Sequence, residues 1–573
     1  MTGLADKRKD VSIVLCGQAG QGIQTVESLL TRISKIAGFN VFASKEYMSR
    51  VRGGMNSTQI RLSSMPVCAR IDRIDILIPL NKGAVDHVAK DISPETILLA
   101  EKEELEEDFA LDQDRFIDVA FTKIAAEIGN KIYSNIVAIG VISGLFGIEP
   151  VIVTNYIKQH FSTKTRDIIQ ANLAAAEAGL KIGCDLVASG KINFKINADV
   201  KVEDQILLSG TEAVALGAIA GGCNFISAYP MSPSTGVLTF LAKNAKEFGI
   251  VVEQAEDEIA AINMVIGAWY AGARGLASTS GGGFALMTEG LSLAGMLESP
   301  VVIHLAQRPG PATGLPTRTE QADLELALYA GHGEFPRIIF APGTLEDAFY
   351  LTQRAFNLAD KFQVPVFVLT DQYFIDSYYN VPSLNLSDVK IEKYIVETKK
   401  DYERYALADN GISARGIPGY GQGFVVVDSD EHDTQGHITE DLDLRTKMVD
   451  KRLRKLKAYE NETLPPKLVG PDNYKNLIIG WGSTYNIINE ALENMARNDT
   501  AFLHFKQVYP LPPATGDFLK KAEKTIIIEN NAASQFGKLI KLHTGIDINE
   551  KILKYNGLSF TVEEIENALR KIL

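Results

Sequence analysis

Short runs of β-branched residues alternate with helical patterns through most of the chain, and this alternation limits the folds open to it. The run at residues 12–16 leads into an amphipathic pattern over residues 23–37, and the same rhythm returns over residues 225–271 and again from residue 477. Strands that alternate with helices form parallel sheets covered by helices. The chain is therefore predicted to be an α/β protein with parallel sheets.

The chain has 573 residues, which is too long for a single hydrophobic core. A chain of this length indicates about three or four domains. Three parallel-sheet domains are predicted at residues 1–190, 205–395 and 471–573. Residues 396–470 are charged and rich in turn residues, so they are predicted to form an irregular insertion or linker. The basic run at residues 451–457 is predicted to be a solvated helix face rather than a nucleic-acid site.

Composition excludes several classes of protein. The net charge of −13 argues against non-specific binding to nucleic acid. The four cysteines are scattered without a C-x-x-C pair, which excludes a self-contained zinc or iron–sulfur site of ordinary spacing and suits a reducing compartment. The longest apolar run, at residues 136–148, is too short to span a bilayer, and the first residues contain no apolar signal core. A cytoplasmic protein is expected.

Residues 304–323 contain the most informative motif, because a buried β-type run ends there in an arginine within a loop of glycines and prolines. The prolines restrict the backbone of this loop, while Arg308, Thr313, Thr317 and Arg318 offer donors of the kind that hold a carboxylate or phosphate. The alternative is a rigid surface turn with solvated arginines.

Two further loops near the N-terminus could bind anions. Residues 17–22 form a G-x-x-G-x-G segment between a strand and a helix, where backbone amides could cradle an anion, although a plain tight turn is an equal alternative. The spacing differs from the dinucleotide fingerprint and no Walker lysine follows, so nicotinamide and ATP binding are weakly supported. Residues 45–56 carry two arginines before a glycine pair, which suits an anion-binding or an interface role.

Glu258 begins an otherwise apolar helical pattern. An acidic residue in the first turn of a helix has an ordinary explanation, because it complements the helix dipole. However, Glu258 lies in a series of βα units in which a turn at residues 229–236 and the Arg308 loop also follow strand ends. The carboxyl ends of parallel strands share one edge of a sheet, so these three features are expected to converge on one site.

The chain resembles the α subunit of the 2-oxoacid:ferredoxin oxidoreductases, which use thiamine diphosphate, and is most similar to the 2-oxoglutarate type. The resemblance covers nearly the whole chain and is carried by motifs at residues 229–235, 279–287, 307–317, 411–415 and 428–433. Residues 17–22 and 52–57 resemble the γ subunit of the family, fused upstream. The resemblance implies a thiamine-diphosphate pyrimidine-binding fold at residues 205–395 and a transketolase C-terminal-like domain at residues 471–573.

The resemblance also implies roles for individual residues. Glu258 would hydrogen-bond the aminopyrimidine ring of the cofactor, and Tyr229 and Pro230 would lie at the cofactor site. Arg308 would pair with the 1-carboxylate of the substrate, and Ser232 would hydrogen-bond nearby in place of the family's usual threonine. Thr317 would line the far end of the substrate. A carboxyl shielded at an apolar helix start can keep a raised pKa, as the role of Glu258 requires.

The resemblance leaves part of an enzyme unaccounted for in this chain. It has no cysteine spacing for an iron–sulfur cluster and no Gly-Asp-Gly segment for magnesium and diphosphate. A β subunit is therefore expected to bring Mg²⁺ and a [4Fe-4S] cluster within an (αβ)₂ assembly. Coenzyme A would be the co-substrate and ferredoxin the electron acceptor.

The implied reaction is the oxidative decarboxylation of 2-oxoglutarate to succinyl-CoA and carbon dioxide, a step of the tricarboxylic acid cycle or, in reverse, of carbon fixation. Two alternatives stay open: a branched-chain or aromatic 2-oxoacid as substrate, and a non-catalytic scaffold that binds a nucleotide or coenzyme A. Asp430 and His432 are predicted to lie in a solvated acidic loop rather than at the cofactor cleft. His304 is predicted to be a core histidine. No chemistry is assigned to Gly480, Gly482 and Ser483.

Overall fold

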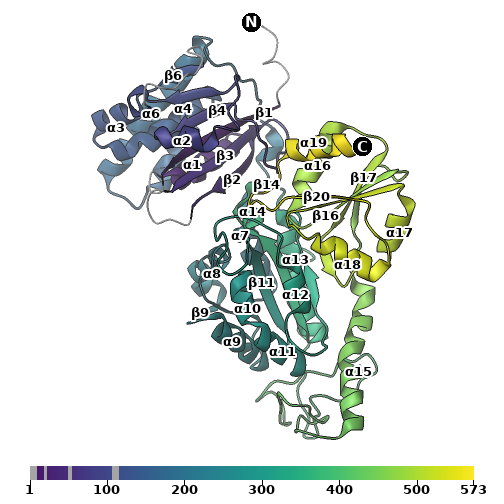
Figure 1. Ribbon diagram of the computed structural model, residues 1–573. Helices are drawn as coiled ribbons and strands as arrows, with labels where there is room; N and C mark the ends of the chain where they lie inside the picture. Colours follow the sequence, from purple (N-terminus) through teal and green to yellow (C-terminus); the bar gives the residue numbers. More distant parts are fainter. Residues whose placement is uncertain (1–8, 19–21, 49–53, 106–114) are drawn as a thin grey trace. The chain divides into compact units, whose positions relative to one another are not determined.

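The computed structural model describes residues 9–18, 22–48, 54–105 and 115–573. They fold into a mixed α/β structure with three sheets whose strands are mostly parallel, which confirms the predicted fold class (Figure 1). The chain divides into two compact units. The first holds Met1–Leu208 with the short segments Asp376–Ser383 and Thr561–Glu563, and the second holds Ser209–Ile375, Leu384–Phe560 and Glu564–Leu573.

The sheet of the first unit is mixed rather than purely parallel. The hairpin formed by β2 (Asn40–Glu46) and β3 (Met55–Ser63) is antiparallel and was not among the predicted strands, because antiparallel strands can carry polar side chains and so lack a long apolar run. The strands lie in the order β6 (Phe116–Asp118), β5 (Ile97–Ala100), β4 (Ile76–Pro79), β1 (Asp10–Gln18), β3 (Met55–Ser63), β2 (Asn40–Glu46), β14 (Tyr378–Val381) and β7 (Ile206–Ser209).

In the first unit, α4 (Ser134–Leu145) and α6 (Arg166–Ala188) pack with their backbones in close contact. A Cβ atom on Gly140 of α4 would lie 2.3 Å from the carbonyl oxygen of Ala176 in α6, and one on Gly183 would lie 2.2 Å from that of Val141. Glycine is therefore required where these helices meet. The helices of this unit are α1 (Ile23–Ile36), α2 (Lys82–Val88), α3 (Phe121–Ile128), α4 (Ser134–Leu145), α5 (Pro150–His160) and α6 (Arg166–Ala188).

The second unit contains a seven-stranded sheet that is parallel except at β18. All positions of β11 and β13 are buried, which explains the apolar runs that predicted strands at residues 300–305 and 364–369. The strands lie in the order β18 (Gln507–Tyr509), β12 (Ile338–Phe340), β13 (Pro365–Asp371), β11 (Val301–Gln307), β10 (Gly275–Thr279), β8 (Phe225–Ala228) and β9 (Val251–Gln254).

Helices cover this seven-stranded sheet, with α9 packed on β8 and β10 and α13 packed on β11 and β13. They are α7 (Gly210–Ala220), α8 (Thr235–Phe248), α9 (Glu258–Tyr270), α10 (Gly281–Leu286), α11 (Thr288–Met296), α12 (Leu324–Tyr329), α13 (Leu345–Phe362) and α14 (Gln372–Asp376). No helix in the described part of the chain is long and apolar enough to cross a membrane.

The third sheet also belongs to the second unit. Its order is β15 (Lys467–Val469), β17 (Thr500–Phe505), β16 (Asn476–Trp481), β19 (Lys524–Glu529) and β20 (Glu550–Leu553), and only β15 is antiparallel to its neighbour. Its helices are α16 (Thr484–Met495), α17 (Thr515–Lys521), α18 (Gln535–Thr544) and α19 (Val562–Ile572). Since β18 follows β17 closely but joins the seven-stranded sheet, the chain links the two sheets directly.

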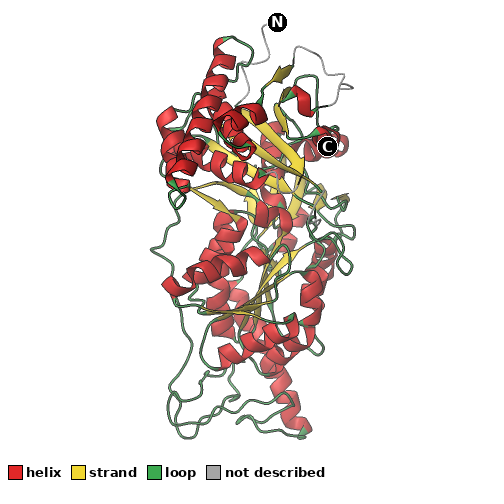
Figure 2. Ribbon diagram, turned by 90° about the vertical axis from the view of Figure 1, so that its left-hand side faces the viewer, coloured by secondary structure: helices red, strands yellow, loops and turns green. Residues whose placement is uncertain are grey.

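Residues 384–441 are largely irregular and lead into α15 (Leu442–Tyr459) (Figure 2). The prediction that the basic run on this helix is solvated is wrong for three of its cations. Lys451 is 0%, Lys455 2% and Arg452 4% exposed. Each carboxylate oxygen of Glu298 lies 2.6 Å from one of the two lysine ammonium groups. The helix is therefore anchored by buried ion pairs, which its own sequence could not reveal.

His432 is also buried rather than solvated. It is 0% exposed and its ring packs against Tyr405, with the ring centroids 3.9 Å apart and the planes tilted by 33°. Its Nδ1 bonds the carbonyl oxygen of Asp430 at 3.0 Å, and burial lowers the pKa of the imidazole. Asp430 itself is exposed, as predicted. The acidic neighbours of His432 suggested a surface loop, but the aromatic contact places the ring in the interior of the insertion.

Candidate active site

The carboxyl ends of three adjacent strands bring the predicted site residues to one edge of the seven-stranded sheet. β11, β10 and β8 are neighbours, and their chains continue into Arg308, the Gly281–Gly283 turn and the turn at residues 229–234, respectively. α9, which begins with Glu258, follows β9 at the end of the same series. The predicted convergence on one edge is therefore present in the fold.

Glu258 is 2% exposed, although it stands in the first turn of α9. The helix is capped by Asp257 instead, whose Oδ1 accepts a hydrogen bond of 2.8 Å from the backbone nitrogen of Ala260. Oε1 of Glu258 accepts a longer contact, 3.4 Å, from the hydroxyl of Thr279. Burial raises the pKa of Glu258, although Thr279 and Arg308 act to lower it. Glu258 is therefore a shielded acid that the helix does not need as a cap.

The three glycines that begin α10 each face a different segment. A Cβ atom on Gly283 would lie 2.2 Å from Oε1 of Glu258 and from the hydroxyl of Thr279, and one on Gly281 would lie 2.4 Å from both carboxylate oxygens of Asp323. A Cβ on Gly282 would lie 3.5 Å from the carbonyl oxygen of Ala312. Side chains at positions 281 and 283 would thus displace two carboxyl groups, so the glycines keep these groups against the backbone.

Arg308 directly follows β11 and is 8% exposed. Its Nη1 donates a hydrogen bond of 2.7 Å to the carbonyl oxygen of Ser232. Its Nε is buried and has no hydrogen-bond partner among the described residues. Burial lowers the pKa of the guanidinium, while Asp323 and Glu258 act to raise it. A buried guanidinium that retains an unused donor is suited to a planar anion such as a carboxylate.

Asp323, which sequence reasoning missed, is part of the same cluster. Burial raises the pKa of its carboxyl to about 7, against the opposing effect of Arg308. Its Oδ2 is buried and, within the described ranges, has no hydrogen-bond partner. Asp323 directly precedes the short helix α12, so the sequence suggests only a helix cap; the side chain makes no cap hydrogen bond.

The loop between Arg308 and Asp323 is held by both of its neighbouring sheets. Gly314 has a φ of 54°, and a Cβ there would lie 1.8 Å from the carbonyl oxygen of Pro309. At the other end, the amide of Gln321 donates to the carbonyl oxygen of Trp481 at 2.9 Å, and its Oε1 accepts from the backbone nitrogen of Asn530 at 3.0 Å. The third sheet therefore helps to position the arginine loop.

Ser483 also joins the two sheets, a role that its sequence context did not suggest. Its hydroxyl donates to Oδ2 of Asp371 at the end of β13, and Oδ1 of Asp371 accepts from the hydroxyl of Thr319 at 3.2 Å. Asp371 is 2% exposed, and burial raises the pKa of its carboxyl. These contacts connect the third sheet to the arginine loop through one buried carboxyl.

The remaining predicted site residues lie around this cluster with different exposure. Tyr229 is 41% exposed, Pro230 and Ser232 are half-buried, and Thr317 is 9% exposed. Ser232 contacts Arg308 through its backbone carbonyl, and the predicted hydrogen bond of Ser232 near the substrate stays a prediction. His304 is a core residue, as predicted, because both ring nitrogens lie 2.9 Å from a hydroxyl, those of Ser278 and Thr370. Burial lowers the pKa of His304 to about 3.

Several buried polar groups at this edge of the sheet could hold a polar ligand. In the part of the chain that the structure describes, three buried atoms without a hydrogen-bond partner gather around α10: Oγ of Ser280, Nε of Arg308 and Oδ2 of Asp323. Buried polar atoms of this kind normally have partners, so they indicate positions for ligand groups. Glu258 adds an acid whose raised pKa permits it to share a proton with a ring nitrogen.

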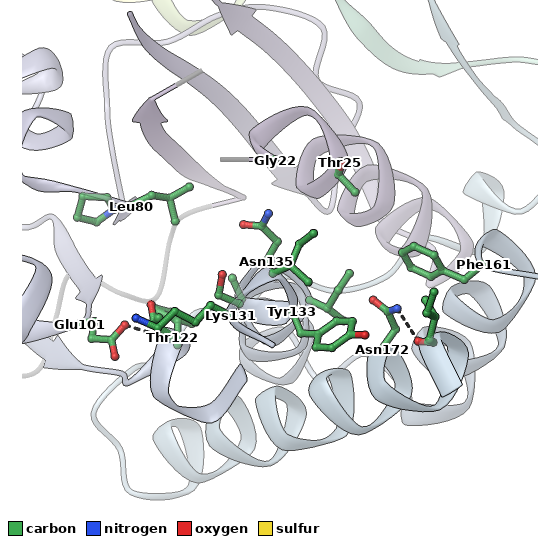
Figure 3. Close-up of a pocket in the computed structure, with 17 residues that line it drawn as sticks. Gly22, Thr25, Leu80, Glu101, Thr122, Lys131, Tyr133, Asn135, Phe161 and Asn172 are labelled. Atoms are coloured by element: carbon green, nitrogen blue, oxygen red, sulfur yellow. Dashed lines mark hydrogen bonds between the residues drawn. The ribbon is translucent and has the colours of Figure 1, made fainter. Parts of the chain in front are cut away.

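The first unit has a separate cavity of about 720 Å³ (Figure 3). Gly22, at the end of the predicted glycine loop, lies at its margin beside Asn135, and a Cβ on Gly22 would lie 2.2 Å from Nδ2 of that residue. Lys131, Glu101 and Asn172 add polar groups to its lining. Residues 19–21 of the glycine loop and residues 49–53, with their two arginines, lie outside the described residues, so both anion-binding predictions stay untested.

Comparisons with known proteins agree with this arrangement. Residues 216–451 match the family profile described as pyruvate flavodoxin/ferredoxin oxidoreductase, thiamine diphosphate-binding, and residues 12–182 match the one described as pyruvate ferredoxin/flavodoxin oxidoreductase. The chain is 32% identical to a 2-oxoacid:ferredoxin oxidoreductase subunit alpha from Sulfolobus sp, over 98% of this chain and 97% of that relative.

Two further proteins share almost the full length of the chain. A 2-oxoglutarate oxidoreductase subunit KorA from Mycobacterium tuberculosis is 28% identical over 99% of this chain and 92% of its own length. The solved structure of 2-oxoglutarate:ferredoxin oxidoreductase from Magnetococcus marinus, with 2-oxoglutarate, coenzyme A and succinyl-CoA bound, is similar with a TM-score of 0.92 and 30% identity. That match covers 99% of this chain and 100% of the other.

Proposed function

The chain belongs to the family of 2-oxoacid:ferredoxin oxidoreductase α subunits and carries its thiamine diphosphate-binding domain, and we propose that it decarboxylates 2-oxoglutarate oxidatively. The products would be succinyl-CoA and carbon dioxide, with electrons passing to ferredoxin. The observation that carries this proposal is the buried pair of Glu258 and Arg308, which lie near each other without their charges being neutralised by an ion pair.

Thiamine diphosphate, when bound, supplies the nucleophilic carbon and the electron sink that decarboxylation of a 2-oxoacid requires. Glu258 is proposed to hold a proton toward the aminopyrimidine ring. Burial raises the pKa of its carboxyl, so Glu258 holds a proton more readily than an exposed glutamate does. Tyr229 and Pro230, at the end of β8, are proposed to line the cofactor site.

Arg308 is proposed to bind the 1-carboxylate of the substrate and so to orient the bond that breaks. Its Nη1 is already fixed by the carbonyl oxygen of Ser232, which leaves Nε and the rest of the fork for the carboxylate. A guanidinium held at one end loses little freedom when it binds an anion, so the orientation is prepared in advance. The hydroxyl of Ser232 is proposed to add a second hydrogen bond at the same place.

The far end of the substrate is proposed to lie along the loop at Thr317. The 2-oxoglutarate assignment is supported by the full-length similarity to proteins named for that substrate. Leu315 favours a second candidate, because this residue of the same loop is 50% exposed and would suit a branched-chain or aromatic 2-oxoacid. The distinction is therefore proposed to depend on residues near positions 315–318 together with the β subunit.

The partner is proposed to be a β subunit in an (αβ)₂ assembly in the cytoplasm. It would supply Mg²⁺ with the diphosphate-binding segment and a [4Fe-4S] cluster, since the four cysteines of this chain are far apart in sequence. Coenzyme A would accept the acyl group. The domain division proposed from the sequence, residues 1–190, 205–395, 396–470 and 471–573, assigns the cofactor face of this chain to the second domain.

The test is co-expression of the chain with its β partner, followed by assay of viologen reduction with coenzyme A and a panel of 2-oxoacids. The panel contains 2-oxoglutarate, pyruvate, a branched-chain 2-oxoacid and an aromatic one. The highest kcat/KM is expected with 2-oxoglutarate, and Arg308→Ala is expected to lower kcat/KM for every substrate.

A preference for the branched-chain or aromatic acid would change the proposed substrate but not the proposed class of reaction. If the purified complex had no thiamine-dependent activity with any member of the panel, the scaffold alternative would be favoured. If both Glu258→Ala and Arg308→Ala left activity intact, the proposed site would be wrong.

A further inference from the structure

Asp323 carries a carboxyl that the proposed reaction does not yet use. Both of its oxygens are directed at the backbone of Gly281, where a Cβ would lie 2.4 Å from each of them. Oδ2 is buried without a hydrogen-bond partner among the residues described, and the backbone nitrogen of Asp323 is fixed by Oε1 of Gln307 at 3.0 Å. The carboxyl is therefore held in place beside the site without being paired.

Two charged side chains act on the ionisation of Asp323. Arg308, after β11, favours its ionised form, and Glu320, in the same loop, opposes it. The turn of α10 that packs on it, Gly281–Gly283, has no ionisable side chain. Glu258, on α9, acts on Arg308 as well, so the one guanidinium is shared between two carboxyls.

We propose that Asp323 is a positioning residue that competes with the substrate for Arg308. When Asp323 is ionised, its negative charge partly offsets the positive charge of Arg308 and so weakens the attraction between Arg308 and the substrate carboxylate. When it is protonated, Arg308 is available to the incoming carboxylate. This inference rests on the proposed function, because it assumes that Arg308 binds the substrate.

Proton uptake is the consequence. An anion that binds Arg308 removes the group that stabilises ionised Asp323, so the carboxylate takes one proton from the buffer as the substrate binds. Because burial already raises the pKa of Asp323 to about 7, this exchange falls above about pH 7, where free Asp323 is ionised. Substrate affinity should therefore decrease as the pH rises through this range.

The test is isothermal titration calorimetry of the complete αβ complex with 2-hydroxyglutarate, which has the carboxylates of 2-oxoglutarate but no reactive carbonyl. Titrations at pH 8 in buffers of different ionisation enthalpy give the number of protons bound. Native complex is expected to take up between about 0.5 and 1 proton per site, and its Kd to rise up to about tenfold from pH 6.5 to 8.5. Asp323→Asn is expected to take up none and to show a flat Kd.

Two further variants keep the result interpretable. Asp323→Ala must lose proton uptake as Asp323→Asn does, which excludes an effect specific to the amide. Glu325→Gln is the matched control, since this carboxyl lies on the adjacent helix, is exposed and pairs with Lys538 at 3.0 Å; it should keep the native uptake. A purely structural role would raise Kd equally at every pH and leave uptake unchanged, which would overturn the inference.

Arg308→Ala separates this inference from the proposed function. If Arg308→Ala weakens binding while Asp323→Asn keeps native proton uptake, Arg308 binds the substrate but Asp323 does not compete for it. If Arg308→Ala binds the probe as tightly as the native complex does, the substrate role of Arg308 fails, and the proposal for Asp323 fails with it.

Discussion

Glu298 and Glu258 are both buried glutamates of the second unit, but their surroundings differ. Glu298 is 1% exposed and has a lysine ammonium 2.6 Å from each oxygen. Burial alone would raise its pKa, yet Lys455 and Lys451 hold that pKa well below its usual range. Glu258 is 2% exposed, has no lysine partner of this kind, and its pKa is raised.

The difference shows how one unit uses buried charge for two purposes. Around Glu298 the opposite charges are in contact, so the ion pairs hold α15 against the segment before β11 and the Glu298 carboxylate stays ionised. Around Glu258 the charges of Arg308 and Asp323 are near but not neutralised, and burial raises the pKa values of both acids. Charges that are kept apart in this way retain the capacity to bind or move a proton.

Glu258→Gln should cause the largest change. Loss of the acid is expected to lower kcat/KM of the αβ complex by about 10²- to 10⁴-fold, the usual contribution of a proton-transferring side chain. Stability should stay the same or rise, because the substitution removes a carboxyl that is costly to ionise when buried. Viologen reduction and urea unfolding measure the two effects. Glu256→Gln, at an exposed position two residues earlier, is the control and should retain activity.

Glu298→Gln should have the opposite pattern. It leaves Lys451 and Lys455 buried without a counter-charge, so the free energy of unfolding is expected to fall by about 3–5 kcal/mol. Urea denaturation followed by circular dichroism measures this fall. A loss of activity without loss of stability would contradict the distinction drawn between the two glutamates.

Arg308→Lys tests whether the geometry of the guanidinium matters beyond its charge. Lysine keeps the charge but lacks the planar fork, so loss of hydrogen bonds to a charged group is expected to raise KM for the 2-oxoacid by about 10- to 100-fold. Steady-state kinetics of the complex give KM and kcat separately. An unchanged KM would indicate that Arg308 contributes charge alone.

Lowering the pH should reduce the contribution of Glu298 to the free energy of unfolding. Its folded-state pKa lies below the usual value of 4.5, so its stabilisation is complete above that pH and is lost as the pH falls further. The difference in unfolding free energy between native protein and Glu298→Gln should shrink below pH 4.5, by at most about 1.4 kcal/mol per pH unit. Urea titrations from pH 3 to pH 7 measure it. A constant difference would contradict the assignment to Glu298.

Lys538→Ala should have the smallest effect. Lys538 pairs with Glu325 at 3.0 Å, and the two side chains are 54% and 39% exposed. Removing an exposed pair is expected to change the unfolding free energy by less than about 1 kcal/mol. Thermal or urea unfolding of the variant and the native protein checks this. A change as large as that of Glu298→Gln would show that burial does not explain why the two ion pairs differ in their effect on stability.

Much of the sheet architecture could be predicted because parallel strands are buried on both faces. Residues 225–228 and 300–305 are mainly apolar, and strands of the structure lie at both. The β2–β3 hairpin could not be predicted in this way, because both strands contain many polar residues and neither has an apolar run longer than three residues. β14 pairs with β2 although more than three hundred residues separate them, and nothing local indicates that partner.

In the candidate site, too, local sequence pattern predicted some residues and missed others. Glu258 and Arg308 could be predicted because each follows a strand, and strand order brings such residues to one edge. Asp323 was missed because an aspartate before a helix is usually a cap. Lys451 and Lys455 were predicted to be solvated because their partner, Glu298, lies 153 residues earlier than Lys451 in the chain. Local pattern identifies positions on elements, whereas pairing between distant elements requires the fold.

The attachment of the arginine loop bears on how such a chain could acquire a new substrate. The loop is fixed at its start by the backbone contact between Pro309 and Leu315, at 3.1 Å, and at its end by the backbone nitrogen of Thr319, which donates to Gly557 at 3.1 Å. These contacts use main-chain atoms, so they do not depend on the side chains at residues 315–318. That short segment can therefore vary between lineages, or be exchanged as a cassette in the laboratory, while Arg308 stays in place.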